Sequence, residues 1–209
     1  MNIEGISSLI HDYLIKLSFE QRVEAINILK ATLSVHSPFM QHPVDCVQWV
    51  KMNHIKMNDY NPNTMSPAEV KLLRTSLIQN GYTQPIVVYD DARGNYIVVD
   101  GAHRFAAGYK TPELVETLKG YTPVVKVNKE NNSRQERMAA TVRHNRARGQ
   151  HRIEGMMDIV IELNRRGWND EKISKELGME PDEVLRMRQL SGLTELFADA
   201  DFSQAWTVK

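Results

Sequence analysis

The sequence predicts an α+β protein in which a small mixed β-sheet with flanking helices is followed by an all-α helix-turn-helix region. Three observations lead to this class. Two short runs rich in β-branched residues, Pro85 to Tyr89 and Tyr96 to Val99, flank a turn-rich segment and predict a β-hairpin. Apolar residues at helical spacing occupy much of the remaining chain. The segment from Ile173 to Val184 has the spacing of a helix-turn-helix.

The composition indicates a globular protein without a strong overall field. The chain has 209 residues, of which 42% are hydrophobic, and its charged residues balance to a formal net charge of zero. Any basic surface must therefore be local. The single cysteine, Cys46, excludes an internal disulfide. No apolar run approaches the roughly 20 residues of a membrane helix, and the N-terminus lacks a signal-peptide core. We therefore predict a cytoplasmic protein with no membrane partner.

Residues 1–43 are predicted to form a helical hairpin and a connector. Apolar residues recur at helical spacing in the first helix, and Ser18 to Gln21 is a capping-box signature that begins the second. The hairpin could cover the core or mediate pairing with a second copy. Because each helix must bury its stripe somewhere, we expect packing within the chain. The stripe of the first helix consists of Ile6, Leu9, Ile10, Leu14 and Leu17.

Residues 44–130 carry the predicted sheet and its helices. The pattern from Val44 to Ile55 predicts extended chain leading to a first strand. Ser66 to Glu69 combines an N-cap, a proline at the first helical position and an acidic residue, so a helix begins there, and Gly81 ends it. The later elements are a short helix that begins at Thr111-Pro112 and a strand from Thr122 to Val127.

The segment from Val98 to Gly108 is a predicted strand-to-helix turn with the features of an anion site. Gly101 allows the backbone to approach a ligand closely, and amides exposed at a helix start favour phosphate. His103 and Arg104 stand where they could add charge-assisted hydrogen bonds to that anion. The alternative is an ordinary turn with an exposed basic pair.

Residues 131–209 are predicted to be a helical region that contains a concentrated basic stretch. Residues 143–152 include four arginines and two histidines. Asn145 has an amide that can coordinate a hydrated metal or bind phosphate, and Arg148 has a planar fork that suits phosphate oxygens. The sequence does not apportion the other arginines, at 143, 146 and 152, between nucleotide and DNA phosphates.

The predicted helix-turn-helix has Gly178 at its tight turn and Val184 pointing the second helix inward. Helical pairs of this kind also occur as plain packing units. Three acidic residues near the start of the second helix would repel phosphate, so the pattern favours the fold more than direct base reading. They are Glu180, Asp182 and Glu183. The candidate DNA contacts are Lys172, Lys175, Arg186 and Arg188.

Three sequence boxes together resemble the ParB/sulfiredoxin superfamily: Asn80 to Val88, Val98 to Gly108 and His144 to Arg148. Within it the chain looks most like the ParB-like regulators called immunoglobulin-binding regulator B, or IbrB. The resemblance implies a small α+β fold that binds a nucleotide, either ATP, ADP or CTP, together with Mg²⁺, and a helical last third similar to the DNA-binding part of ParB. The implied nucleotide-binding residues are Thr83, Gln84, Gly101, His103, Arg104, Asn145 and Arg148, with Asn145 also implied as the metal ligand.

Some residues of this chain differ from the family patterns, and these differences limit the reactions that the resemblance implies. Ala102 stands where sulfiredoxins have the catalytic cysteine, so sulfinic acid repair is excluded. Relative to ParB, two carboxylates are lost, because Ala102 and His103 replace Glu-Arg and His144 replaces a glutamate. The resemblance to ParB therefore predicts neither a preference for CTP nor the hydrolysis of CTP.

The run Asp100-Gly101-x-His103-Arg104 is closer to the motif of ParB-like free-serine kinases. In that interpretation Asp100 and His103 are the catalytic candidates. Asp100 is a general base or a magnesium ligand, and His103 contacts the charged phosphoryl group while it is transferred. The alternative for Asp100 is a strand-end aspartate that caps the following helix.

The sequence supports three functional hypotheses. The leading one is a ParB-like nucleotide-binding regulator of transcriptional co-activator type, which couples nucleotide binding, with or without hydrolysis, to engagement of DNA or a protein partner. The second is an ATP- or ADP-dependent phosphotransferase or nucleoside triphosphatase without a DNA role. The third is a nuclease, for which the chain lacks a convincing two-metal carboxylate cluster. The IbrB resemblance also implies a protein partner related to phosphoadenosine-phosphosulfate reductases, and the sequence leaves a homodimer open.

Overall fold

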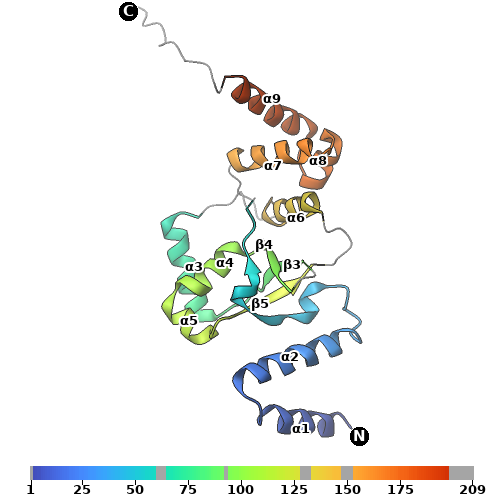
Figure 1. The fold of residues 1–209 in the computed structure, drawn as a ribbon, viewed down its shortest axis with the longest axis vertical. Coiled ribbons are helices and arrows are strands. Elements are labelled where there is room, and N and C mark those ends of the chain that lie inside the picture. The colour runs from blue at the N-terminus through green and yellow to red at the C-terminus, as the bar shows by residue number, and fades with distance from the viewer. Residues whose placement is uncertain (1, 60–64, 92–93, 128–132, 147–152, 198–209) are drawn as a thin grey trace, which may run out of the picture. The chain divides into compact units, whose positions relative to one another are not determined.

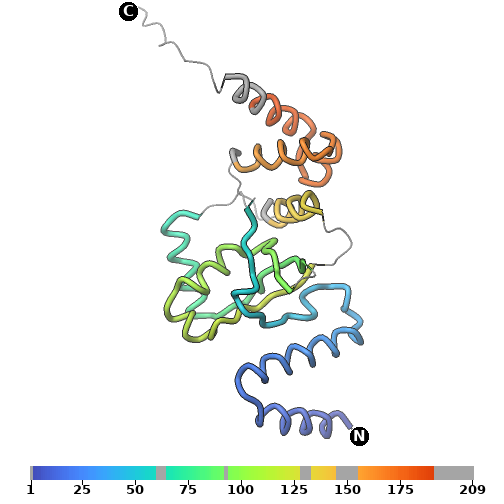
Figure 2. Tube along the Cα trace, in the orientation of Figure 1, coloured from blue at the N-terminus to red at the C-terminus, as the bar shows by residue number. Residues whose placement is uncertain are grey.

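The computed structural model of the chain describes residues 2–59, 65–91, 94–127, 133–146 and 153–197 (Figure 1). The chain divides into two compact units. Residues 1–58 and 65–130 form the first, here called the sheet unit, and residues 59–64 and 131–209 form the second, called the helical unit. Figure 2 follows the trace through both, and each unit is described separately below.

The sheet unit contains a five-stranded mixed sheet with the strand order β1-β5-β3-β4-β2. The pairs β1/β5 and β3/β4 are antiparallel, whereas β3/β5 and β2/β4 are parallel. The predicted hairpin is confirmed as β3/β4, in which Val88 lies opposite Val98. This mixed sheet with its helices confirms the α+β class. The strands are β1 (Gln48–Lys51), β2 (Ile55–Lys56), β3 (Ile86–Asp90), β4 (Tyr96–Asp100) and β5 (Tyr121–Lys126).

The main core of the sheet unit lies between the central strands and α4 (Ala102–Lys110). Phe105 of α4 packs against strand residues that are completely buried, namely Ile86, Val88, Val98 and Val124. Each such buried side chain contributes about 1.5–3 kcal/mol relative to exposure. A second cluster joins α4 to α3 (Pro67–Asn80) and α5 (Pro112–Leu118), and Figure 1 shows these three helices together beside the sheet.

The start of α3 has the predicted capping box. The amide of Ser66 donates to Glu69 Oε2 at 2.7 Å, and the amide of Glu69 donates to Ser66 Oγ at 3.3 Å. These hydrogen bonds to Ser66 lower the pKa of the Glu69 carboxyl. Gly81 ends α3 with a φ of +68°, a conformation that glycine adopts without strain.

A helical hairpin, α1 (Ile3–Leu14) and α2 (Phe19–Ser34), precedes the sheet. The carboxamide of Asn27 on α2 forms a pair of hydrogen bonds with the backbone of Trp49 in β1. Asn27 Nδ2 donates to the Trp49 carbonyl at 2.6 Å, and the Trp49 amide donates to Asn27 Oδ1 at 2.9 Å. Because β1 is an edge strand, Asn27 takes the place of a neighbouring strand and protects this edge. The 3₁₀ turns η1 (Pro43–Cys46) and η2 (Met52–His54) flank β1.

The expectation that the stripe of α1 packs within the chain holds in part: Ile10, Leu14 and Leu17 are half-buried, whereas Ile6 and Leu9 are exposed. No residue of α1 is buried, and the exposed fractions of Leu9 and Tyr13 are 61% and 57%. The hairpin is fastened mainly at its loop, where the Arg22 guanidinium donates to the carbonyls of Leu14 and Leu17, each at 3.0 Å. The physical reason is that α2 uses its polar face for β1 and offers a single buried residue, Ala25.

The helical unit consists of α6 (Arg134–Arg146), α7 (Ile153–Arg165), α8 (Asp170–Leu177) and α9 (Pro181–Phe197) in the described residues. The α6 and α7 helices are joined by an ion pair, because Arg134 Nε donates to Glu162 at 2.8 Å. The hydrogen bonds from Arg134 and Arg166 lower the pKa of Glu162. The core of this unit includes Met138, Val142, Val160, Leu163, Ile173, Leu177 and Val184. Within the described ranges, no helix combines the length and hydropathy needed to cross a membrane.

Candidate nucleotide-binding and DNA-binding sites

The turn from β4 to α4 has the geometry expected of a phosphate-binding turn. Gly101 is the N-cap of α4 and has φ +89°. A Cβ at this position would lie 3.0 Å from both Arg104 Nη2 and Ile86 Cδ1, so glycine is required by both conformation and space. As a glycine, the N-cap residue has no side chain that could cap the helix. The first amides of α4 therefore lack intrahelical partners and carry the positive end of the helix dipole.

The Arg104 guanidinium fastens the two central strands together at this turn. Its Nη1 donates to the Gln84 carbonyl at 3.0 Å and to Gln84 Oε1 at 2.9 Å, and its Nη2 donates to Asp100 Oδ2 at 3.1 Å. The Arg104 and Asp100 side chains are only 12% and 4% exposed. Asp100 is therefore not the N-cap residue of α4, a position that Gly101 takes, and its carboxylate accepts from Arg104.

His103 offers a buried nitrogen beside the uncapped helix start. Its Nε2 is buried and has no hydrogen-bond partner among the described residues. A positive charge on His103 would also contribute to the lowered pKa of Glu69, which places this imidazole near the start of α3. A buried polar nitrogen without a partner costs free energy unless a ligand or water satisfies it.

Tyr82 stabilises the turn through a hydrogen bond to the backbone of α4, and the sequence analysis did not predict this role. Its hydroxyl donates to the Arg104 carbonyl at 2.7 Å, and burial raises the pKa of the phenol. Gly108, one turn further along α4, leaves the space that the hydroxyl needs, because a Cβ there would lie 2.4 Å from the Tyr82 oxygen. The only sequence signal was the Gly108 at the end of the second box.

Substituting Gly108→Ala is expected to lower the free energy of unfolding by about 1–3 kcal/mol, because the new methyl group displaces Tyr82 and its hydrogen bond. Urea denaturation measures the effect. In a Tyr82→Phe background the same substitution should cost clearly less, since the clashing oxygen is gone. Equal costs in the two backgrounds would contradict this packing.

The other predicted nucleotide-binding residues are placed as follows. Gln84 contacts Arg104 directly, and Thr83 beside it is exposed. Asn145 belongs to α6 in the helical unit, but its side chain lies outside the described residues, as does the whole of Arg148. The structure therefore brings together Gln84, Asp100, Gly101, His103 and Arg104, and the roles of Asn145 and Arg148 stay predictions.

The helix-turn-helix forms as predicted within the helical unit. Gly178 ends α8 in the left-handed conformation, with φ +63° and ψ +37°. The Ser174 hydroxyl donates to the Met179 carbonyl at 2.6 Å and thus closes the turn. Ile173 and Val184 are completely buried, so both helices face one core. Asn169 caps α8 by accepting from the Lys172 amide at 2.8 Å.

The four candidate DNA contacts differ in their availability. Arg188 donates to both oxygens of Asp170, at 2.7 and 2.6 Å. Lys172 lies over the Trp168 ring, 4.1 Å from its centroid, and 3.8 Å from Glu136. Lys175 and Arg186 are exposed. A DNA phosphate would therefore compete with existing carboxylates for Arg188 and Lys172 and meet Lys175 and Arg186 more readily.

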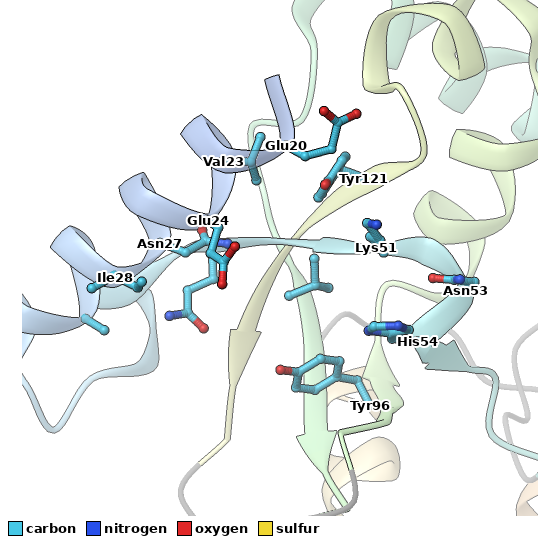
Figure 3. A pocket seen from close by; sticks show the side chains of 13 residues that line it. Glu20, Val23, Glu24, Asn27, Ile28, Lys51, Asn53, His54, Tyr96 and Tyr121 are labelled. Atoms are coloured by element: carbon cyan, nitrogen blue, oxygen red, sulfur yellow. The ribbon is translucent and has the colours of Figure 1, made fainter. Parts of the chain in front are cut away.

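A cavity of about 570 Å³ lies elsewhere in the sheet unit, between α2 and the β1–β2 segment. Figure 3 shows its lining, with Glu20 and Glu24 from α2 and with Lys51 and His54 from the strand side. None of the predicted site residues lines it. Among the residues with described side chains, no group of three or more His, Cys, Asp or Glu side chains is arranged to hold a metal.

Comparisons with known proteins find two family models that match successive parts of the chain. The model of the ParB N-terminal domain matches residues 40–140, and the model of the IbrB-like C-terminal helix-turn-helix domain matches residues 151–199. Uncharacterized protein YbdM of Escherichia coli K12 is 49% identical over 197 residues, covering 94% of this chain and 93% of that protein.

The solved structures that a comparison of structures matches to this chain include two of the C-terminally truncated chromosome-partitioning protein ParB from Caulobacter crescentus. The one complexed with CTP-γ-S has a TM-score of 0.40 and 16% identity, covering 72% of this chain and 83% of that chain. The one complexed to the centromeric parS site has a TM-score of 0.46 and 15% identity, covering 75% and 80%. With its ParB N-terminal domain and its IbrB-like helix-turn-helix domain, the chain belongs to the ParB-like superfamily and is of the IbrB type.

Proposed function

We propose that the protein is a nucleotide-binding regulator that couples nucleotide binding to engagement of DNA or a protein partner. The observation that carries this proposal is the uncapped start of α4 beside the unpartnered His103 Nε2. Backbone amides at a helix start and a neighbouring imidazole are suited to the oxygens of a phosphate group. The bound nucleotide is expected to be ATP, ADP or CTP with Mg²⁺.

In this proposal the residues of the turn have different tasks. The amides that follow Gly101 and the His103 imidazole contact phosphate. Arg104 and Gln84 mainly hold the turn in shape, because the guanidinium is already engaged by Gln84 and Asp100. Thr83 is exposed next to Gln84 and offers a hydroxyl. Asn145, as a metal ligand, and Arg148 follow from the family resemblance.

The regulatory part of the proposal is supported by the helix-turn-helix. Lys175 and Arg186 are exposed cations on α8 and α9 and are the first candidates for DNA phosphates. Acidic residues near the start of α9 weaken direct base reading there, so an additional protein partner is expected to share in recognition. The IbrB type suggests that this partner is related to phosphoadenosine-phosphosulfate reductases.

Calorimetric titration with ATP, ADP, AMP and CTP in the presence of Mg²⁺ tests the nucleotide step. One nucleotide should bind to the wild-type protein, and His103→Ala should weaken it about tenfold or more, the effect of losing one hydrogen bond to a charged group. The matched control is His54→Ala, an exposed histidine away from the turn. Binding that His103→Ala leaves unchanged would contradict the proposed site. Product formation that depends on His103 would instead favour the phosphotransferase or triphosphatase hypothesis.

Titration of DNA with and without that nucleotide tests the regulatory step. The Lys175→Ala and Arg186→Ala variants should each weaken DNA binding and reduce the slope of log affinity against log salt by about one. The exposed Lys71→Ala on α3 serves as the control. Absence of DNA binding under both conditions would refute the DNA role.

A further inference from the structure

The cavity between α2 and the β1–β2 segment is a second candidate binding site, separate from the turn at α4. Its volume of about 570 Å³ falls within the range of small-molecule pockets. The cavity lies entirely within the sheet unit, and none of its lining residues belongs to the candidate nucleotide-binding set. The function proposed above therefore leaves this cavity unused.

Hydrogen bonds hold the two walls of the cavity in place. Asn27, which lines the cavity from α2, donates to the Trp49 carbonyl at 2.6 Å and accepts from the Trp49 amide at 2.9 Å. One turn further along α2, Lys30 Nζ donates to the Val47 carbonyl at 3.0 Å. The α2 helix cannot close onto β1 or leave it without breaking these bonds. The cavity is thus preformed, as ligand pockets usually are.

Opposite charges line the two sides of the cavity. Glu20 and Glu24 lie one turn apart on α2, whereas Lys51 lies at the end of β1 (Figure 3). Among the described residues, no ion pair engages any of these three side chains. Two like charges at positions i and i+4 of a helix repel each other. A bound cationic group near both carboxylates would relieve that repulsion.

Apolar and aromatic side chains supply much of the remaining lining. They come from α2 and from three strands of the sheet, and they include Val23, Ile28, Val50, Tyr96 and Tyr121. Removing apolar ligand surface from water against such side chains contributes about 25 cal/mol per Å². A ligand that fits the whole cavity therefore combines charged ends with an apolar body.

The distribution of charge across the cavity selects the class of ligand. A compact cavity of this volume is on the order of 10 Å across, the length of about three extended residues. A single amino acid, whose amine and carboxylate share one carbon atom, is too short to reach both sides. A diamine would leave Lys51 without a partner, and a dicarboxylate would be repelled by Glu20 and Glu24.

We propose that the cavity binds a short peptide of two or three residues with free ends. Its amino group lies on the side of Glu20 and Glu24, and its carboxylate is bound by Lys51. The amide of Asn53, which also lines the strand side, offers a further donor to that carboxylate (Figure 3). The apolar side chains of the peptide pack on Val50 and the tyrosine rings.

Calorimetric titration of the full chain without nucleotide tests the ligand class. The tripeptides Ala-Leu-Ala and Ala-Phe-Ala with free ends should bind. Their N-acetylated and C-amidated forms should each bind about tenfold more weakly or worse, because each lacks one hydrogen bond between charged groups. Putrescine and succinate should not bind. Failure of both tripeptides to bind, equal binding of the free and blocked forms, or preferred binding of putrescine or succinate would overturn the proposal.

Variants of the lining residues test the position of the peptide. Glu24→Gln should weaken binding of the free tripeptide about tenfold or more, yet it should not weaken the N-acetylated form further. Lys51→Gln should do the same with the C-amidated form. Glu116→Gln on α5 and Lys71→Gln on α3 are the matched controls, since both residues are exposed and lie outside the cavity lining.

All four replaced side chains are exposed, so each variant should keep the stability of the wild-type protein in urea denaturation. If Glu24→Gln and Lys51→Gln bind the free tripeptide as tightly as the two control variants do, the peptide does not occupy this cavity and the proposal is refuted.

Discussion

Replacing Arg104 by alanine is expected to lower the free energy of unfolding of the sheet unit by about 3–5 kcal/mol. The substitution removes the hydrogen bonds to Gln84 at 3.0 and 2.9 Å and the ion pair with Asp100 at 3.1 Å. The Asp100 side chain is only 4% exposed, so its carboxylate would be left in a buried position without the guanidinium. Urea denaturation gives the change in free energy, and hydrogen exchange of the β3 and β4 amides shows that it arises at this turn.

Matched variants separate the ion pair from a general effect of losing an arginine. Arg74→Ala on α3 removes an exposed arginine and should change stability by less than about 0.5 kcal/mol. Arg104→Lys keeps the charge but loses the planar fork, so its effect should be intermediate. Adding Asp100→Asn to Arg104→Ala should recover part of the loss, since the buried charge disappears. If Arg104→Ala is as mild as Arg74→Ala, the guanidinium does not hold the strands together.

The elements that local chemistry determines were predictable from the sequence. The capping boxes at Ser18 and Ser66 begin α2 and α3 as expected, and the Asn169 side chain caps α8. In each case the signal and its consequence lie within four residues. The β3/β4 hairpin was predictable for a similar reason, because its two strands are adjacent in the sequence.

The pairing of distant segments was not predictable in the same way. The parallel pairs β3/β5 and β2/β4 join strands that are separated by helices or long loops, and no local pattern specifies them. The contact of Tyr82 with the backbone of Arg104 spans 22 positions, so the need for Gly108 became visible only in three dimensions. For α1, periodicity gave the apolar stripe, but it could not tell how much of that stripe the rest of the chain covers.

In the candidate site, too, the local features were predictable and the contacts between distant segments were not. The box from Asp100 to Arg104 predicted a strand-to-helix turn with Gly101 at its corner, and the structure has this turn with the His103 imidazole beside it. The sequence suggested that the Arg104 fork points at a ligand, whereas it is engaged by Gln84 and Asp100. Side-chain direction depends on which strand ends meet, and the sequence of the box alone does not contain that information.

The Ile173→Ala substitution is expected to lower the free energy of unfolding of the helical unit by about 2–5 kcal/mol. Ile173 is completely buried among residues of α6 to α9, and its truncation leaves a cavity in that core. Leu185→Ala on α9 is the matched control, since Leu185 is 45% exposed and should cost far less. Urea denaturation measures both variants, and hydrogen exchange assigns the loss to a unit.

The location of the loss tests whether the two cores are independent. The core around Ile173 shares no residue with the core around Ile86 and Val88 in the sheet unit. Exchange should therefore become faster in α7, α8 and α9, while the β3 and β4 amides keep their protection. DNA binding, where it depends on the helix-turn-helix, should fall with the stability of this unit. Equal loss of protection in both units would mean that they unfold as one, and the helix-turn-helix would then not act as a separately folded module.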